Sequence, residues 1–364
     1  MKTTLRFSYI VATAVFIFSA IGSRADNQPE GFDWTNLVSD IAGVAERVDS
    51  NVINPWGIVP SPSNTIWIAN NGTGTSTLYN TDGVPAPLGN PLVVTIPTAS
   101  TNTEGANPTG IVFNSGSGFV VTKNGHSGPS RFIFVSEDGS ISGWNPQVSA
   151  TAAVIAVDHG SQEAIYKGAA LGTTAAGARL FVTNFHAGKV EIYDQNFMEI
   201  DTANTFRDPN IPTDYAPFGI RNINGLVYVT YAKQDADAED DVAGPGFGFV
   251  DVFSTTGQFL KRLISHGALN APWGLELAPN HFGRFHGALL VGNFGDGRIN
   301  AYNPNHGTFL GTLAKADGTP LAFDGLWGLH FIEKRLFFTA GIADEEHGLF
   351  GVIQAGQVTH HDDD

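Results

Sequence analysis

The stretch Asn54-Pro55-Trp56-Gly57-Ile58 recurs along the chain and decides the fold. The clearest copies keep an amide or small residue, a proline, a larger residue, a glycine and an aliphatic residue in that order. The copies are Asn107-Pro108-Thr109-Gly110-Ile111, Tyr166-Lys167-Gly168-Ala169-Ala170, Ala216-Pro217-Phe218-Gly219-Ile220, Ala271-Pro272-Trp273-Gly274-Leu275 and Leu326-Trp327-Gly328-Leu329. Their glycines stand 51 to 58 residues apart. Six copies at this spacing predict a repeat architecture.

Each copy is followed by short runs of β-branched and aromatic residues that turn residues separate. Residues 65–69, 179–183 and 226–230 are runs of this kind, and residues 189–193 follow the run at 179–183 across a polar loop. Such runs predict strands, and three or four strands per repeat match a propeller blade. We therefore predict an all-β, six-bladed β-propeller with four-stranded blades. A solenoid is the alternative, but its repeats are mostly shorter and need capping units.

The two ends of the repeat array predict how the ring closes. The sixth repeat shows three strands and lacks a fourth, whereas residues 35–39 form a spare strand before the first repeat. Donating this strand to the last blade closes the ring and covers both sheet edges.

The first 25 residues have the pattern of a signal peptide. Lys2 and Arg6 precede an apolar run of 13 residues, and Ser23-Arg24-Ala25 offers a cleavage site. The run is shorter than the ~20 residues of a membrane-spanning helix. We expect an exported protein, periplasmic or secreted, with a single propeller over residues 26–358 and an acidic tail over 359–364.

Composition narrows the classes of partner. Without Lys2, Arg6 and Arg24, the mature chain has 16 basic and 35 acidic residues, a net charge of 16 − 35 = −19. This surface repels phosphate backbones, so nucleic acid is a poor partner. The chain has no cysteine, which excludes disulfides and thiol catalysis. We expect a monomer without a membrane span after cleavage, which binds a small molecule, a glycan or a protein.

The repeat also predicts where ligands bind. In a blade, the loop that enters the innermost strand and the loop between the second and third strands open on the same face. Polar residues cluster in these second loops. The predicted ligand-binding face comprises Asn70, Lys123, His126, Asn184, His186, Asn293, Asp296 and His347.

Three asparagines of this face allow two interpretations. Asn70, Asn184 and Asn293 either cap turns or point their oxygens toward the channel as ligands of calcium. Calcium needs 6–8 oxygens and some carboxylate charge, for which Asp241, Asp296 and Asp344 are the candidates. The acidic insertion over residues 233–248 lacks the EF-hand spacing and is interpreted as an exposed loop.

Aromatic residues recur before the motif glycines. Trp56, Phe218, Trp273 and Trp327 either pack between blades or form a stacking platform for sugars, and packing is the preferred interpretation.

Signatures of known catalysis are missing from the sequence. It contains no G-x-S-x-G, H-E-x-x-H or Walker motif. The candidate general bases are His186, because imidazole titrates near neutral pH, and Asp241.

These motifs resemble a known group of proteins. The blade motif resembles NHL-repeat and SMP-30-like propellers. The stretches at 54–58, 71–79, 232–235, 240–246, 248–253 and 347–351 are more closely similar to a family of exported bacterial propellers with no assigned reaction. The resemblance implies a six-bladed propeller. The distant SMP-30-like relatives are calcium-dependent lactonases and esterases with a glutamate near the first inner strand, where this chain has Val52-Ile53-Asn54-Pro55.

The preferred hypothesis is therefore a non-catalytic binding or scaffold propeller that recognises a ligand on its loop-rich face. The alternative is a calcium-dependent hydrolase of the lactonase or esterase kind with the metal in the channel and His186 or Asp241 as base. A redox or lyase propeller is a third class.

Overall fold

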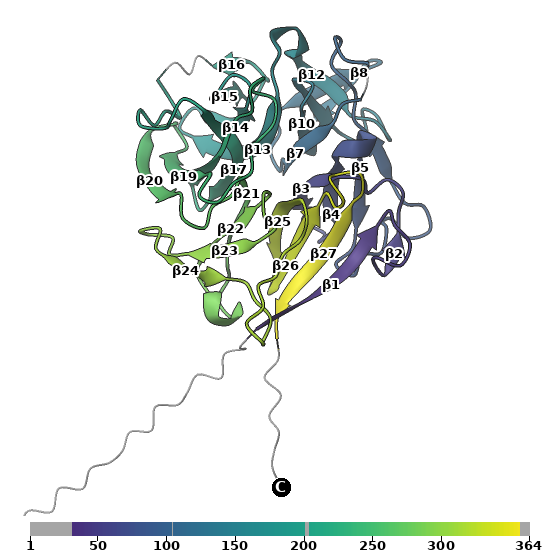
Figure 1. The fold of residues 1–364 in the computed structure, drawn as a ribbon. Coiled ribbons are helices and arrows are strands. Elements are labelled where there is room, and N and C mark those ends of the chain that lie inside the picture. Colours follow the sequence, from purple (N-terminus) through teal and green to yellow (C-terminus); the bar gives the residue numbers. More distant parts are fainter. Residues whose placement is uncertain (1–30, 104, 201–203, 357–364) are drawn as a thin grey trace, which may run out of the picture.

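The computed structural model describes residues 31–103, 105–200 and 204–356 and shows six antiparallel blades around a central axis (Figure 1). The predicted signal peptide and the tail over 359–364 lie outside the described residues. The predicted six-bladed β-propeller with four-stranded blades is confirmed.

Each blade is one sheet whose first strand lies innermost. Blade one contains β3 (Pro55–Pro60), β4 (Ile66–Asn70), β5 (Thr75–Tyr79) and β6 (Val93–Thr95); blade two contains β7 (Pro108–Phe113), β10 (Phe132–Ser136), β11 (Ser140–Trp144) and β12 (Val154–Asp158). Blade three contains β13 (Tyr166–Thr174), β14 (Gly177–Asn184), β15 (Lys189–Asp194) and β16 (Glu199–Ile200); blade four contains β17 (Tyr215–Ile223), β18 (Leu226–Lys233), β19 (Phe249–Ser254) and β20 (Phe259–Ser265). Blade five contains β21 (Pro272–Leu277), β22 (Leu289–Asn293), β23 (Ile299–Tyr302) and β24 (Phe309–Thr312).

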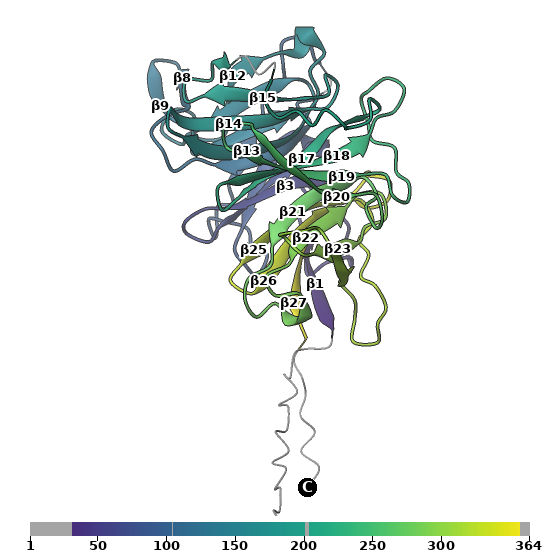
Figure 2. The same cartoon turned by 90° about the vertical axis from the view of Figure 1, so that its left-hand side faces the viewer.

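The sixth blade joins the two ends of the repeat array. It contains β25 (Leu326–Ile332), β26 (Arg335–Ala340), β27 (Leu349–Ala355) and β1 (Phe32–Ser39), with β2 (Arg47–Val48) paired in parallel to β1. β1 pairs antiparallel with β27 and lies beside it in Figure 1 and in Figure 2. Ring closure by an N-terminal strand is therefore confirmed.

Five short elements stand outside this scheme. β8 (Val120–Lys123) and β9 (His126–Pro129) form a separate hairpin between β7 and β10. Three 3₁₀ turns lie at η1 (Asn71–Thr73), η2 (Gly160–Gln162) and η3 (Gly283–Phe285).

The motif glycines are required by the close approach of neighbouring inner strands. A Cβ atom on Gly57 would lie 2.5 Å from the backbone oxygen of Thr109 in the next blade. A backbone oxygen of the next blade likewise faces Gly168, Gly219, Gly274 and Gly328, whereas Gly110 faces the backbone nitrogen of Ala169. Asn54 precedes the motif proline with φ of 43°, a left-handed conformation that asparagine tolerates well. The motif therefore packs one inner strand onto the next.

Apolar residues fill the space between adjacent blades. One cluster joins Trp67 and Phe134 of blades one and two, and another joins Phe181 and Phe253 of blades three and four. In the described part of the chain, no helix is long and apolar enough to cross a membrane.

Candidate functional site

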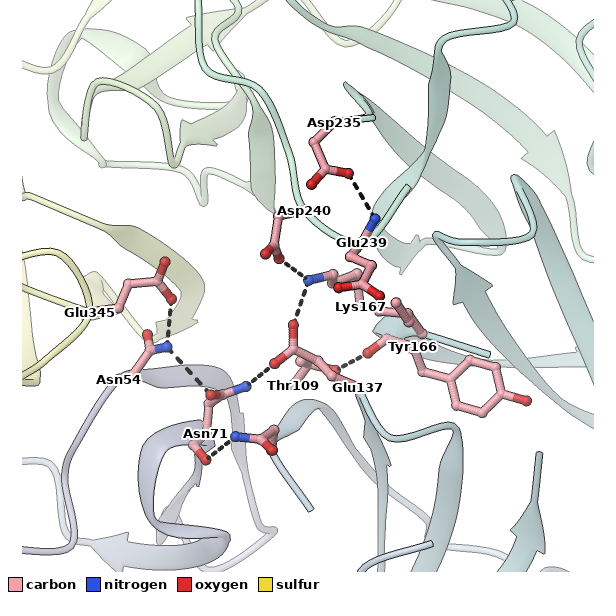
Figure 3. A network of polar contacts seen from close by, with 12 residues as sticks. Asn54, Asn71, Thr109, Glu137, Tyr166, Lys167, Asp235, Glu239, Asp240 and Glu345 are labelled. Carbon is pink, nitrogen blue, oxygen red and sulfur yellow. Dashed lines mark hydrogen bonds and ion pairs between the residues drawn. The ribbon is translucent and has the colours of Figure 1, made fainter. Parts of the chain in front are cut away.

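The third blade carries a lysine where the other motif copies have an aromatic residue or threonine. Lys167 lies at the start of β13 and is only 2% exposed. Its Nζ donates to Glu137 Oε1 at 2.5 Å and to Asp240 Oδ1 at 2.9 Å (Figure 3). Burial alone would lower the pKa of Lys167, but the two carboxylates outweigh it and hold the pKa above its usual value.

The ammonium group of Lys167 also lies over aromatic rings. Its Nζ is 5.4 Å from the ring centre of Trp56 and 5.8 Å from that of Phe185, within cation–π range. Carboxylates and rings together thus surround one cation at the mouth of the channel.

The rings beneath this cation pack together on the axis of the propeller. Trp56 of blade one contacts Phe218 of blade four, Trp273 of blade five and Trp327 of blade six, with ring centres 6.4, 5.9 and 3.4 Å away. Phe294 stacks on Trp327 at 4.1 Å. Residues of opposite blades meet on the axis, so the preferred interpretation of these aromatics as packing is confirmed.

A chain of amide and carboxyl groups continues across the mouth from Glu137. Asn71 donates to Glu137 Oε2 at 2.7 Å, and Asn54 donates to Glu345 Oε2 at 2.5 Å (Figure 3). The indole of Trp327 donates to Asn54 Oδ1 at 3.0 Å, which fixes the amide. Side chains of five blades are joined in this way.

The carboxyl groups of Asp241 and Glu345 also interact electrostatically with Lys167. Burial raises the pKa of Asp241 to about 7, against the influence of Lys167, and Asp240 and Glu345 raise it further. Burial likewise raises the pKa of Glu345 to about 7. Asp241 Oδ2 is inaccessible and has no hydrogen-bond partner among the described residues.

A cleft of about 680 Å³ opens above Lys167. Six carboxyl residues line it: Glu137, Asp138, Glu163, Asp237, Glu239 and Asp240. The cations that line it are Lys167 and, when protonated, His186. Asp237 and Glu239 are exposed at its rim, on the blade-four insertion that the sequence analysis interpreted as an exposed loop. The cleft is therefore strongly acidic, and its volume is that of a small-molecule site.

Two predicted face residues lie elsewhere. Lys123 and His126 belong to the β8–β9 hairpin, which is inserted after the inner strand of blade two. Their placement in the loop between the second and third strands was wrong, because the hairpin has the same strand–turn–strand pattern. The loop in that position connects β10 with β11 and provides Glu137.

The three predicted calcium ligands hydrogen-bond close to their own strands. Asn70 donates to Thr75 and Thr77, and Asn184 donates to Glu191. Asn293 donates to Ala268 and to Asp296, another predicted face residue. These contacts engage the amide nitrogens as local braces. The Oδ1 atoms of Asn70 and Asn293 are buried without a hydrogen-bond partner among the described residues, and the role of the three asparagines as calcium ligands stays a prediction.

The two remaining histidines of the predicted face have different surroundings. His186 lines the cleft, with Nε2 4.0 Å from Glu163 Oε2. His347 Nδ1 contacts Asp40 Oδ2 at 2.6 Å and so fixes the sixth-blade loop to the residue after β1. Of the predicted face, His186 is the residue placed in the cleft.

The sequence analysis missed Lys167, Glu137 and Asp240. Lys167 had a detectable signal, since it is the one charged residue in the column Trp56, Thr109, Lys167, Phe218, Trp273 and Trp327. Asp240 lies in the acidic insertion over residues 233–248, which the sequence analysis interpreted as an exposed loop. Glu137 had no signal, because acidic residues in loops are common.

Comparisons with known proteins agree with this architecture. No family model matches the chain. The uncharacterized protein R648 of Acanthamoeba polyphaga mimivirus is 34% identical over 336 residues, which cover 89% of this chain and 80% of that protein. A Bacteroides thetaiotaomicron protein of unknown function superposes with a TM-score of 0.55 at 11% identity, over 89% of this chain and 76% of that one. Virginiamycin B lyase from Staphylococcus aureus superposes with a TM-score of 0.51 at 14% identity, over 89% and 98%. The two structural similarities concern the fold alone.

Proposed function

The chain belongs to the family of the mimivirus protein R648, and we propose that it is a non-catalytic binding protein whose acidic cleft takes a small organic cation. The observation that carries the proposal is the excess of carboxyl groups around the cleft above Lys167. Glu137 and Asp240 pair with Lys167. Four carboxyl residues of the lining then remain with one histidine, His186: Asp138, Glu163, Asp237 and Glu239.

The floor of the cleft supports this ligand class. It already holds one alkylammonium group, that of Lys167, between carboxylates and above an indole ring. Carboxylates and aromatic faces are the groups that recognise organic ammonium ions. A ligand amine at the rim would meet Asp237 and Glu239, which the structure leaves exposed.

The calcium-dependent hydrolase fits these residues less well. Calcium needs six or more oxygens at about 2.3–2.6 Å. The ammonium group of Lys167 already lies between Glu137 and Asp240. Its positive charge would repel a calcium ion bound to the same two carboxylates. Glu137 and Asp240 therefore do not fit a calcium ion, and no reaction through calcium is derived.

Export belongs to the same proposal. The pattern of residues 1–25 supports it, and so does the resemblance to exported bacterial propellers at the motifs quoted above. The cleft would then meet its ligand outside the cytoplasm.

A charge series of ligands of equal length tests the proposal. Hexamethylenediamine, hexanediol and adipate share six carbons and differ in charge. In isothermal titration calorimetry we expect binding of the diamine alone, and binding that weakens as salt is added, because exposed charges are screened. Equal binding of all three, or of adipate alone, would overturn the proposal.

A further inference from the structure

The inner strands carry a second polar cluster, away from the cleft. Arg221, Glu276 and His330 each stand two residues after a motif glycine, in blades four, five and six. The corresponding residues of blades one, two and three are Val59, Val112 and Ala170. At this level the channel is therefore charged on one side and apolar on the other.

The three polar side chains contact one another across the channel. The Arg221 guanidinium donates to Glu276 Oε2 at 2.5 Å and also contacts His330 Nδ1. His330 Nδ1 lies 3.1 Å from Glu276 Oε2. Burial and the nearby Arg221 lower the pKa of His330, so the imidazole is neutral near pH 7. The cluster thus consists of one guanidinium, one carboxylate and a neutral ring.

A cavity of about 200 Å³ adjoins this cluster within the channel. All six inner strands line it, with Val59, Phe113 and Leu171 on the apolar side. Arg221 is the member of the cluster that lines the cavity, and Glu276 and His330 contact its guanidinium. Trp273, part of the aromatic packing under Lys167, also lines it. For comparison, an apolar protein cavity of about 150 Å³ accommodates benzene.

We infer that this channel cavity binds an α-amino acid with an apolar side chain. An anion alone would add negative charge beside Glu276, and a cation alone would add positive charge beside Arg221. A zwitterion adds no net charge, because its carboxylate can pair with Arg221 at the cavity wall while its ammonium pairs with Glu276, whose Oε2 accepts from the same guanidinium. The aliphatic or aromatic side chain would fill the apolar half.

Access to the cluster is consistent with such a ligand. The side chains of Arg221, Glu276 and His330 are 26%, 12% and 19% exposed. The guanidinium has five N–H donors, which allows it to hold a second carboxylate beside Glu276.

Matched analogues on the unaltered protein provide the first test. L-Leucine, leucinamide and N-acetyl-leucine share a side chain, but the second lacks the carboxylate and the third lacks the ammonium group. In calorimetric titrations we expect leucine to bind and each analogue to bind at least about tenfold more weakly. Absence of leucine and phenylalanine binding at millimolar concentration, or equal binding of the three leucine compounds, would overturn the inference.

Variants of the residues around the cavity then test whether leucine binds there. Arg221→Gln, Glu276→Gln and the cavity-filling Val59→Phe should each weaken leucine binding at least about tenfold. The matched controls Arg335→Gln, at a half-buried position, and Glu333→Gln, at an exposed one, lie outside the cavity lining and should bind as the parent does. Val59→Phe keeps the test valid if a charge variant fails to fold. Leucine binding that survives Val59→Phe in a folded protein would contradict the assignment.

Discussion

Lys167 shows how one residue changes the chemistry of a repeated position. Its counterparts Trp56, Phe218, Trp273 and Trp327 contribute their rings to the packing on the axis. A lysine stem can lie along the same apolar surface while its ammonium group reaches the carboxylates above. At one of the six equivalent motif positions, the chain thus has a lysine that forms the floor of a polar cleft.

Replacing this lysine should cost stability. We expect Lys167→Met to lower the free energy of unfolding by about 2 kcal/mol, because charge-assisted hydrogen bonds are lost. Glu137 and Asp240 are 25% and 76% exposed, so water compensates part of the loss. Urea unfolding measures it, with the exposed Lys334→Met as the matched control, expected within about 0.5 kcal/mol of the parent. Equal stabilities of the two variants would show that the contacts of Lys167 with Glu137 and Asp240 do not stabilise the fold.

Asp241 and Glu345 predict a pH dependence of stability. Folding raises both pKa values to about 7, so between about pH 4 and pH 7 the folded state binds more protons than the unfolded state. Their contribution to stability is therefore greatest below about pH 4 and falls as pH rises to 7. The double variant Asp241→Asn, Glu345→Gln removes this dependence.

The double variant should thus gain stability relative to the parent as pH rises from 4 to 7. Urea unfolding at several pH values measures the difference. A difference that is constant with pH would mean that the two carboxyl groups titrate normally.

At the level of the elements, how much the sequence predicts depends on how regular each blade is. Blades one, three and five follow the expected order of a motif, a strand, a polar turn and another strand, and their strands lie where the pattern predicts them. Blade two departs from it, because the β8–β9 hairpin intervenes between β7 and β10. A hairpin has the same local pattern as two blade strands, and only tertiary pairing distinguishes them.

The candidate site was less predictable than the blades for a related reason. Glu137, Lys167 and Asp240 come from three blades, and their contacts join residues 30 and 73 positions apart. Local pattern places a residue on a face of the ring, but it does not determine which loops meet there.

The packing of inner strands gives a direct prediction about the motif glycines. In Gly219→Ala the new Cβ would overlap the backbone oxygen of Trp273, so neighbouring blades must separate. We expect a loss of about 1–3 kcal/mol in urea unfolding. Gly116→Ala is the control, because the nearest atom to its Cβ is a side-chain oxygen of Asn114 at 3.1 Å. Similar losses at both positions would contradict the role assigned to the motif.

For the whole molecule, the ring separates two chemically different sites. The acidic cleft is built from loops and sits above the aromatic packing, whereas the Arg221 cluster and its cavity lie within the inner strands. Because Gly328 of β25 packs against Trp56 of β3, the inner strands of blades six and one adjoin and the ring that supports both sites is continuous. The proposed ligands differ accordingly, a cation in the cleft and a zwitterion in the channel.

The affinity of the cleft for hexamethylenediamine, measured before and after removal of its rim charges, is the most direct test of the binding function. The double variant Asp237→Asn, Glu239→Gln keeps Glu137 and Asp240, the two carboxylates that bind Lys167. We expect it to bind the diamine at least about tenfold more weakly than the parent does. The control Asp317→Asn, Glu333→Gln removes the same two charges from exposed positions outside the cleft lining and should bind the diamine as the parent does. Equal affinities of the two double variants would contradict the assignment of the acidic cleft as the cation-binding site.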